Sequence, residues 1–167
     1  MSYALEELSA DCHDAIAEGN NPEGREKVRQ YLEKALADRD FVMTHLGPVE
    51  TSARNILYED PDFNFCIIAH VYEGPRASQP HDHGSSWAIY GQAEGVTEMT
   101  EWNVIKKPEN GEAGVCEPVK VYEMKPGDAV VYNEGVVHSP RREATTRLIR
   151  IEGQNLEGMK RDSFKAA

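Results

Sequence analysis

The first 46 residues have a hydrophobic period between three and four, which is typical of amphipathic helices. Asn21 can cap a helix, and Pro22 suits the first helical position because proline needs no N–H there. A similar spacing recurs over residues 3–17. The pattern therefore predicts two short N-terminal helices whose apolar stripes consist of Leu5, Leu8, Cys12, Ala15 and Ile16 in the first and Val28, Tyr31, Leu32, Ala35 and Leu36 in the second.

From about residue 50 the hydrophobic period changes to two, the period of a strand with one buried face. Turn signals separate the alternating runs, for example Gly74-Pro75, Asn110-Gly111 and Pro126-Gly127. Many short strands with no helix between them indicate an all-β antiparallel sandwich or barrel. The expected strands are 63–72, 86–90, 96–105, 119–124, 129–132 and 147–152.

A chain of 167 residues fits one compact unit. We expect a helical segment over 1–46 packed on the barrel, the β-barrel itself over 47–155, and a polar C-terminal tail over 156–167. Antiparallel barrels with exposed strand edges often pair, so a homodimer is one expectation for the assembly.

The chain is acidic, with 18 Lys and Arg against 29 Asp and Glu and a formal net charge of −11. Such a surface repels phosphate backbones and anionic lipids, which argues against nucleic-acid and membrane partners and leaves a small-molecule ligand in a local pocket. Neither an apolar run long enough to span a bilayer nor a secretory signal is visible. The sparse cysteines argue for a reducing compartment, so we expect a cytoplasmic protein; they are Cys12, Cys66 and Cys116.

Three histidines form the candidate site. His81 and His83 project to the same face of an extended strand, so their imidazoles can converge on one ion. Downstream, a glycine turn at Gly127 leads into a strand, and a second turn at Gly135 precedes His138. On an all-β background these segments predict a metal site formed by the three histidines, whereas the pair alone could equally be two surface or strand histidines.

These segments resemble the cupin superfamily, whose first motif is G-x5-HxH-x3,4-E-x6-G and whose second is G-x5-PxG-x2-H-x3-N. The second is matched in spacing from Gly127 to His138, with Arg142 where asparagine is usual. Trp87 and Ala88 occupy the positions of the glutamate ligand, which leaves three neutral histidines. The resemblance implies a double-stranded β-helix, that is, a cupin barrel or jelly roll, with short N-terminal helices.

Within this superfamily the chain is similar to the cysteine dioxygenase type, whose iron is held by three histidines. That resemblance implies Fe(2+) as the metal, with Ni, Mn or Zn as alternatives, and dioxygen and a small-molecule substrate as partners. It implies a mononuclear non-haem iron dioxygenase that inserts oxygen into a small organic acid, with a mercapto acid as the first substrate to test. It also implies that Arg54 binds the substrate carboxylate. Near the position of the family's serine-histidine-tyrosine triad stand Ile151, Gly153 and Asn155, which leaves the substrate open.

Two aromatic residues flank the ligand segments, and we expect Trp87 and Tyr132 to line the pocket, although aromatics on barrel strands are more often core. The ligand set alone does not choose the reaction. A metal-dependent lyase or isomerase, a diketone-type dioxygenase and a non-catalytic ligand-binding cupin remain alternatives.

Overall fold

The structure, a computed structural model, describes residues 2–47 and 53–167. It begins with the helices α1 (Leu5–Glu18), α2 (Pro22–Leu36) and α3 (Arg39–Leu46). The Asn21 side chain caps α2 by accepting the Gly24 N–H at 2.9 Å, as its position predicts. The third helix is an addition to the two that were predicted. It begins because the Asp38 carboxylate accepts the backbone N–H groups of Asp40 and Phe41.

Ten strands within the described residues form two five-stranded sheets. The first sheet has the order β1-β2-β9-β4-β7 and the second the order β10-β6-β5-β8-β3. Their bounds are β1 Asn55–Glu59, β2 Cys66–Tyr72, β3 Arg76–Ala77, β4 Ala88–Glu94, β5 Thr97–Lys106, β6 Gly114–Met124, β7 Ala129–Tyr132, β8 Val137–Arg142, β9 Thr146–Glu152 and β10 Phe164–Ala166.

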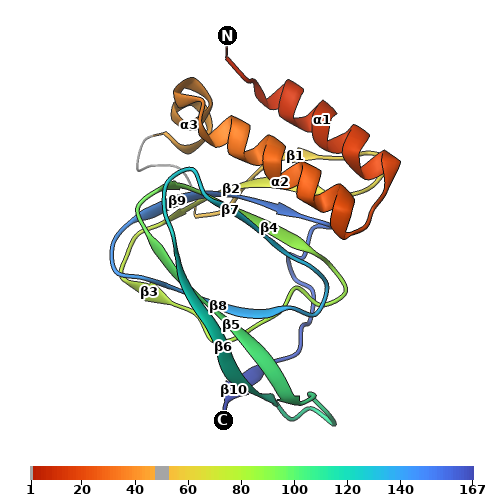
Figure 1. The fold of residues 1–167 in the computed structure, drawn as a ribbon, viewed down its shortest axis with the longest axis vertical. Helices are drawn as coiled ribbons and strands as arrows, with labels where there is room; N and C mark the ends of the chain where they lie inside the picture. Colours follow the sequence, from red (N-terminus) through yellow and green to blue (C-terminus); the bar gives the residue numbers. More distant parts are fainter. Residues whose placement is uncertain (1, 48–52) are drawn as a thin grey trace.

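The two curled sheets face each other and make a double-stranded β-helix (Figure 1). This is the fold that the resemblance implies, and it agrees with the all-β barrel that the strand pattern predicts. All strand pairs are antiparallel except β6–β10, which is parallel. Strand β10 comes from the segment predicted as a polar tail, and its Phe164 is buried against Cys116 and Val137.

The helices cover the outer face of the first sheet (Figure 1). Period-two alternation sends one set of side chains from each strand of that sheet to the helices and the other set into the barrel. Gly91 on β4 lets α2 approach closely, because a Cβ at this position would lie 2.7 Å from Leu36 Cδ1 and 2.8 Å from Leu32 Cδ2. In the described part of the chain, no helix has the length and apolar character that crossing a membrane requires.

Candidate metal centre

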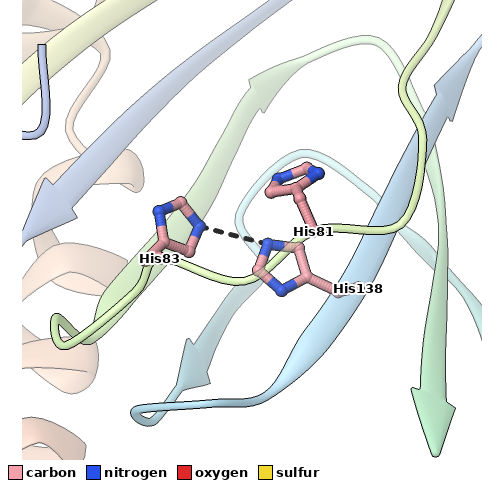
Figure 2. Close-up of side chains that lie close together, drawn as sticks. All are labelled: His81, His83 and His138. Atoms are coloured by element: carbon pink, nitrogen blue, oxygen red, sulfur yellow. Dashed lines mark hydrogen bonds between the residues drawn. The ribbon is translucent and has the colours of Figure 1, made fainter. Parts of the chain in front are cut away.

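The three predicted ligands come from two segments that are far apart in the sequence. His81 and His83 lie in the connection between β3 and β4, and His138 lies on β8. A short antiparallel bridge joins the segments, since His81 and His138 each donate a backbone N–H to the other's carbonyl at 2.9 Å. Figure 2 shows the rings of His83 and His138 pointing toward each other, with His81 beside them. One ring nitrogen of each residue lies within 4.8 Å of the others, so the structure brings the three imidazoles together.

The spacing of the His83 and His138 ring nitrogens fits a single metal ion. His83 Nε2 lies 3.2 Å from His138 Nε2. Two nitrogens that are each about 2.1 Å from one ion, at the angles of octahedral or tetrahedral coordination, are about 3.0 to 3.4 Å apart. The observed distance falls inside this range. Two nitrogen lone pairs this close repel each other unless a proton or a cation lies between them, and a metal ion meets that requirement.

The ring orientations leave the inward nitrogens available as ligands. His81 Nδ1 lies 2.9 Å from the Gln79 carbonyl, and His138 Nδ1 lies 3.1 Å from the Val136 carbonyl. A carbonyl can only accept, so each Nδ1 carries the proton of the neutral ring and each Nε2 keeps its lone pair. His83 Nδ1 is buried and has no hydrogen-bond partner among the described residues.

Burial also keeps the three rings neutral. Loss of solvation lowers the pKa of His81, His83 and His138 below the ordinary histidine value. The positive charge of Arg150 lowers these pKa values further. Neutral imidazole is the form that binds metals, so the protein holds all three candidate ligands in the competent state.

Tyr90 is a residue of the centre that sequence reasoning missed. It lies on β4, is 2 % exposed, and places its hydroxyl 3.0 Å from His83 Nε2 and 3.2 Å from His138 Nε2. Burial raises the pKa of this phenol. The signal was present in the strand pattern, because Ala88 and Tyr90 share the face opposite to Trp87 and Ile89.

The two aromatic residues predicted to line the pocket lie on opposite faces of the first sheet. Tyr132 faces the barrel interior, where its ring stacks on His138 with centroids 4.1 Å apart. Trp87 instead packs in the core beneath the helices, with the Arg25 guanidinium 5.5 Å from its ring centroid. The pocket-lining prediction for Trp87 is therefore corrected. Trp87 directly precedes β4 and, like Ile89, points toward the helices, whereas Ala88 and Tyr90 point into the barrel.

Arg54 lies just before β1, at the edge of the first sheet, and does not line the cavity beside the histidines. Its guanidinium lies 3.2 Å from Glu157 and 3.6 Å from Glu152, and it donates to Asn155 Oδ1 at 3.1 Å. Glu152 in turn pairs with Arg150. Glu152 thus links Arg54 to Arg150, which lines the cavity. In the first sheet, β2 and β9 lie between β1, next to Arg54, and β4.

A cavity of about 480 Å³ opens beside His81. Four arginines line it, and they come from separate segments: Arg76 on β3, Arg142 on β8, Arg150 on β9 and Arg161 near the C-terminus. Period two gave a signal for one of them, since Arg142 lies four positions after His138 on the same strand and therefore shares its face. The other three carry no local signal of convergence, because only the fold brings their segments together.

A second group of potential ligands, His13, Asp60 and Asp62, lies between α1 and the turn after β1. Asp60 accepts the backbone N–H groups of Asp62 and Phe63, and one of its oxygens lies 2.8 Å from His13 Nδ1. These bonds fix the turn and tie it to the helix, so we assign this group a structural role.

Comparisons with known proteins do not place the chain in a family. No protein-family model matches it, and no curated protein matches it. Among solved structures, KdgF from Halomonas sp. is 18% identical with a TM-score of 0.47, covering 64% of this chain and 82% of that one. A cupin-2 domain containing protein from Shewanella frigidimarina is 14% identical with a TM-score of 0.47, covering 66% of this chain and 89% of that one.

A third solved structure, a protein with a double-stranded beta-helix domain from Klebsiella pneumoniae, is 15% identical with a TM-score of 0.44 and covers 66% of this chain and 84% of that one. Similarities at this level establish neither a family nor a function. The double-stranded β-helix described above rests on the chain's own strand order, and the candidate metal centre rests on the geometry of the three histidines.

Proposed function

We propose that this chain is a metal-dependent dioxygenase that holds one Fe(2+) through His81, His83 and His138 and oxidises a small organic acid. The observation that carries the proposal is the convergence of three neutral imidazoles beside a cationic cavity. Three neutral ligands leave the ion its full charge and open positions for exogenous groups. When bound, a ferrous ion supplies Lewis-acid and redox chemistry toward dioxygen and an anionic substrate.

The three proposed ligands differ in their exposure. His81 lines the cavity, whereas His83 and His138 are 2 % and 0 % exposed and do not line it. Tyr132 stacks on His138 and restricts its ring. The Tyr90 hydroxyl, which lies close to two ligand nitrogens, can donate or hold a proton at that oxygen.

For a mercapto acid the overall change is the addition of both atoms of one dioxygen molecule to sulfur. The thiol R–SH becomes the sulfinic acid R–SO2H, so sulfur loses four electrons and dioxygen gains them. No further reductant is required. The thiol must be deprotonated to act as an anionic ligand, and a neighbouring cation favours that form.

The first test is metal content followed by oxygen consumption. Elemental analysis of the purified chain should give about one divalent ion per chain, as expected for a single three-histidine centre. The ferrous protein should then consume oxygen with at least one member of a panel that contains cysteine, 3-mercaptopropionate, cysteamine, mercaptosuccinate and small diketones. Mass spectrometry should show a product that is heavier by two oxygen atoms.

Two variants control this test. His81→Ala removes a partly exposed ligand and should abolish both metal content and oxygen consumption, while circular dichroism shows that the barrel is retained. His45→Ala removes a histidine of α3 that packs at a tilt against Phe41, outside the centre, and should change neither. Turnover without oxygen, supported by Mn, Ni or Zn, would replace the dioxygenase with a lyase or isomerase. Absence of any bound metal would overturn the proposal, as would ligand binding without product.

A further inference from the structure

The cavity beside His81 is cationic in a chain whose net charge is −11. Its lining includes Arg76, Arg142, Arg150 and Arg161 and a single acidic residue, Asp162. Glu152 stands beside the cavity and pairs with Arg150 at 3.2 Å. Four arginines against the two carboxylates of Asp162 and Glu152 leave an excess of about two positive charges around the cavity, which an anionic ligand can meet.

Arg142 is the strongest indication that the excess charge serves a ligand. Arg142 is only 3 % exposed, and it forms no ion pair within the described part of the chain. Its Nε donates to Thr97 Oγ1 at 3.2 Å, and its guanidinium lies 4.6 Å from the Tyr72 ring centroid. Its Nη2 is buried and has no hydrogen-bond partner among the described residues. A buried charge with an unsatisfied donor is costly unless something else occupies its free position.

Arg150, which also lines the cavity, has a second buried donor without a hydrogen-bond partner among the described residues. Its Nη1 pairs with Glu152 and its Nη2 donates to the Tyr72 hydroxyl at 3.4 Å, whereas its Nε is buried without a partner among the described residues. Its guanidinium lies 4.4 Å from the centroid of the Tyr90 ring, whose hydroxyl contacts two of the candidate metal ligands. An anion held by Arg150 would therefore lie next to the metal centre.

We propose that this cavity binds a small organic dianion, with Arg142 and Arg150 holding one anionic group deep in the barrel and Arg76 and Arg161 attracting the second group at the entrance. A planar guanidinium can take a carboxylate or a phosphate through two parallel hydrogen bonds. A volume of about 480 Å³ suits a ligand of this size. The inference names the substrate class of the proposed dioxygenase and rests on it for the reaction, although binding of the dianion itself requires no metal.

The test is calorimetric titration of the full chain, both as purified and after metal removal. Succinate is the dianionic probe, butyrate its monoanionic counterpart of the same chain length, and inorganic phosphate the phosphoryl probe. Succinate should bind at least about 10-fold more tightly than butyrate, because loss of one charge-assisted contact corresponds to roughly 10- to 150-fold in affinity. If phosphate binds as tightly as succinate, the result supports a dianionic ligand that carries a phosphoryl group. If succinate binds and phosphate does not, the ligand is a dicarboxylate.

Matched variants separate the cavity from the surface. Arg142→Met and Arg76→Gln should each weaken succinate binding by about 10- to 150-fold. Arg142→Lys should lose part of the affinity, because lysine keeps the charge but cannot form two parallel hydrogen bonds as a guanidinium does. Arg141→Gln is the control, since Arg141 is exposed, pairs with Glu98 and Glu143, and points away from the cavity. Arg76 lies on an exposed two-residue strand, so Arg76→Gln should leave the fold intact even if Arg142→Met does not.

Two results would overturn the inference: butyrate binding as tightly as succinate, or both arginine variants binding succinate with wild-type affinity. Failure of the proposed function gives a different result. In that case succinate still binds to the metal-free chain in an Arg142-dependent way, but no substrate consumes oxygen. Conversely, the ferrous protein could consume oxygen with an uncharged substrate at a rate that Arg142→Met leaves unchanged. That result would support the dioxygenase proposal and overturn the dianion proposal.

Discussion

At the scale of single residues, the cavity pairs chemical usefulness with a cost in stability. Arg142 is 3 % exposed, has no ion-pairing partner in the described part of the chain, and leaves one buried donor unsatisfied. Its hydrogen bond to Thr97 and its contact with the Tyr72 ring recover part of the lost solvation. Desolvation of a whole charge is the larger effect, as the lowered pKa of the Arg142 guanidinium on burial also indicates.

The first prediction follows from this balance. Arg142→Met replaces the charge with an apolar side chain of similar length and should raise the free energy of unfolding of the ligand-free chain by about 1 to 3 kcal/mol. Urea unfolding at pH 7.5 measures the change. Arg141→Gln, which removes an exposed arginine, should stay within about 0.5 kcal/mol of the wild type. A loss of stability in Arg142→Met would show that Thr97 and Tyr72 satisfy the charge on their own.

At the scale of elements, α1 is tied to the turn between β1 and β2 by one buried carboxylate. Asp60 accepts two backbone N–H groups of the turn, the Tyr58 hydroxyl and the His13 ring. Burial alone would raise the pKa of Asp60, but these hydrogen bonds outweigh it and lower the pKa. The same contact with Asp60 raises the pKa of His13.

The second prediction concerns pH. Because the pKa of His13 is raised on folding, its contribution to stability is full below the unfolded value of about 6.5 and is lost as pH rises through the higher folded value. Asp60 stays ionised throughout this window, since its pKa is lowered. The stability difference between the wild type and His13→Asn should therefore be larger at pH 5.5 than at pH 9. Urea midpoints at the two pH values give the comparison, and a difference that is equal at both would refute the charged pair.

The element scale also shows which strands a linear pattern can find. Long runs rich in β-branched and apolar residues, such as β2 and β9, lie within or close to the predicted ranges. Strand β3 has two residues, and the bridge at His81 is a single residue pair with His138. Both are too short to show a hydrophobic period in the sequence. Strand β10 forms only because Phe164–Ala166 pairs with Gly114–Cys116, a contact between segments that local sequence does not reveal.

At the scale of the whole molecule, the convergence of the three histidines was predictable and the cavity was not. The histidines could be found because two local spacings, HxH and the two glycine turns before His138, each specify a ligand position. Tyr90 and Arg142 could have been predicted to face the barrel interior from the alternation of side chains along their strands. The convergence of Arg76, Arg150 and Arg161 depends on how the two sheets close. The net charge of −11 is a sum over the whole chain, so it gives no sign of a local cationic cavity.

The third prediction is that metal binding stabilises the whole barrel, because His81 and His83 precede β4 whereas His138 lies on β8. An ion that binds only the folded chain adds stability that depends on its concentration, about 4 kcal/mol at 1,000 times the dissociation constant. For a chain of this size that corresponds to a rise of about 8 to 16 °C in Tm. Calorimetric scans with Mn(2+), which avoids ferrous oxidation, measure the rise, and excess chelator should reverse it.

His81→Ala is the decisive comparison for this prediction. The variant keeps both sheets and the helices but loses the ligand that lines the cavity, so its Tm should not respond to Mn(2+) or to chelator. His45→Ala should respond like the wild type, because His45 packs on α3 against Phe41 and contributes no ligand to the centre. An equal rise in His81→Ala would place the ion elsewhere, with His13, Asp60 and Asp62 as the group to examine next. Loss of the rise in His81→Ala alone would tie the stability of the barrel to the three imidazoles.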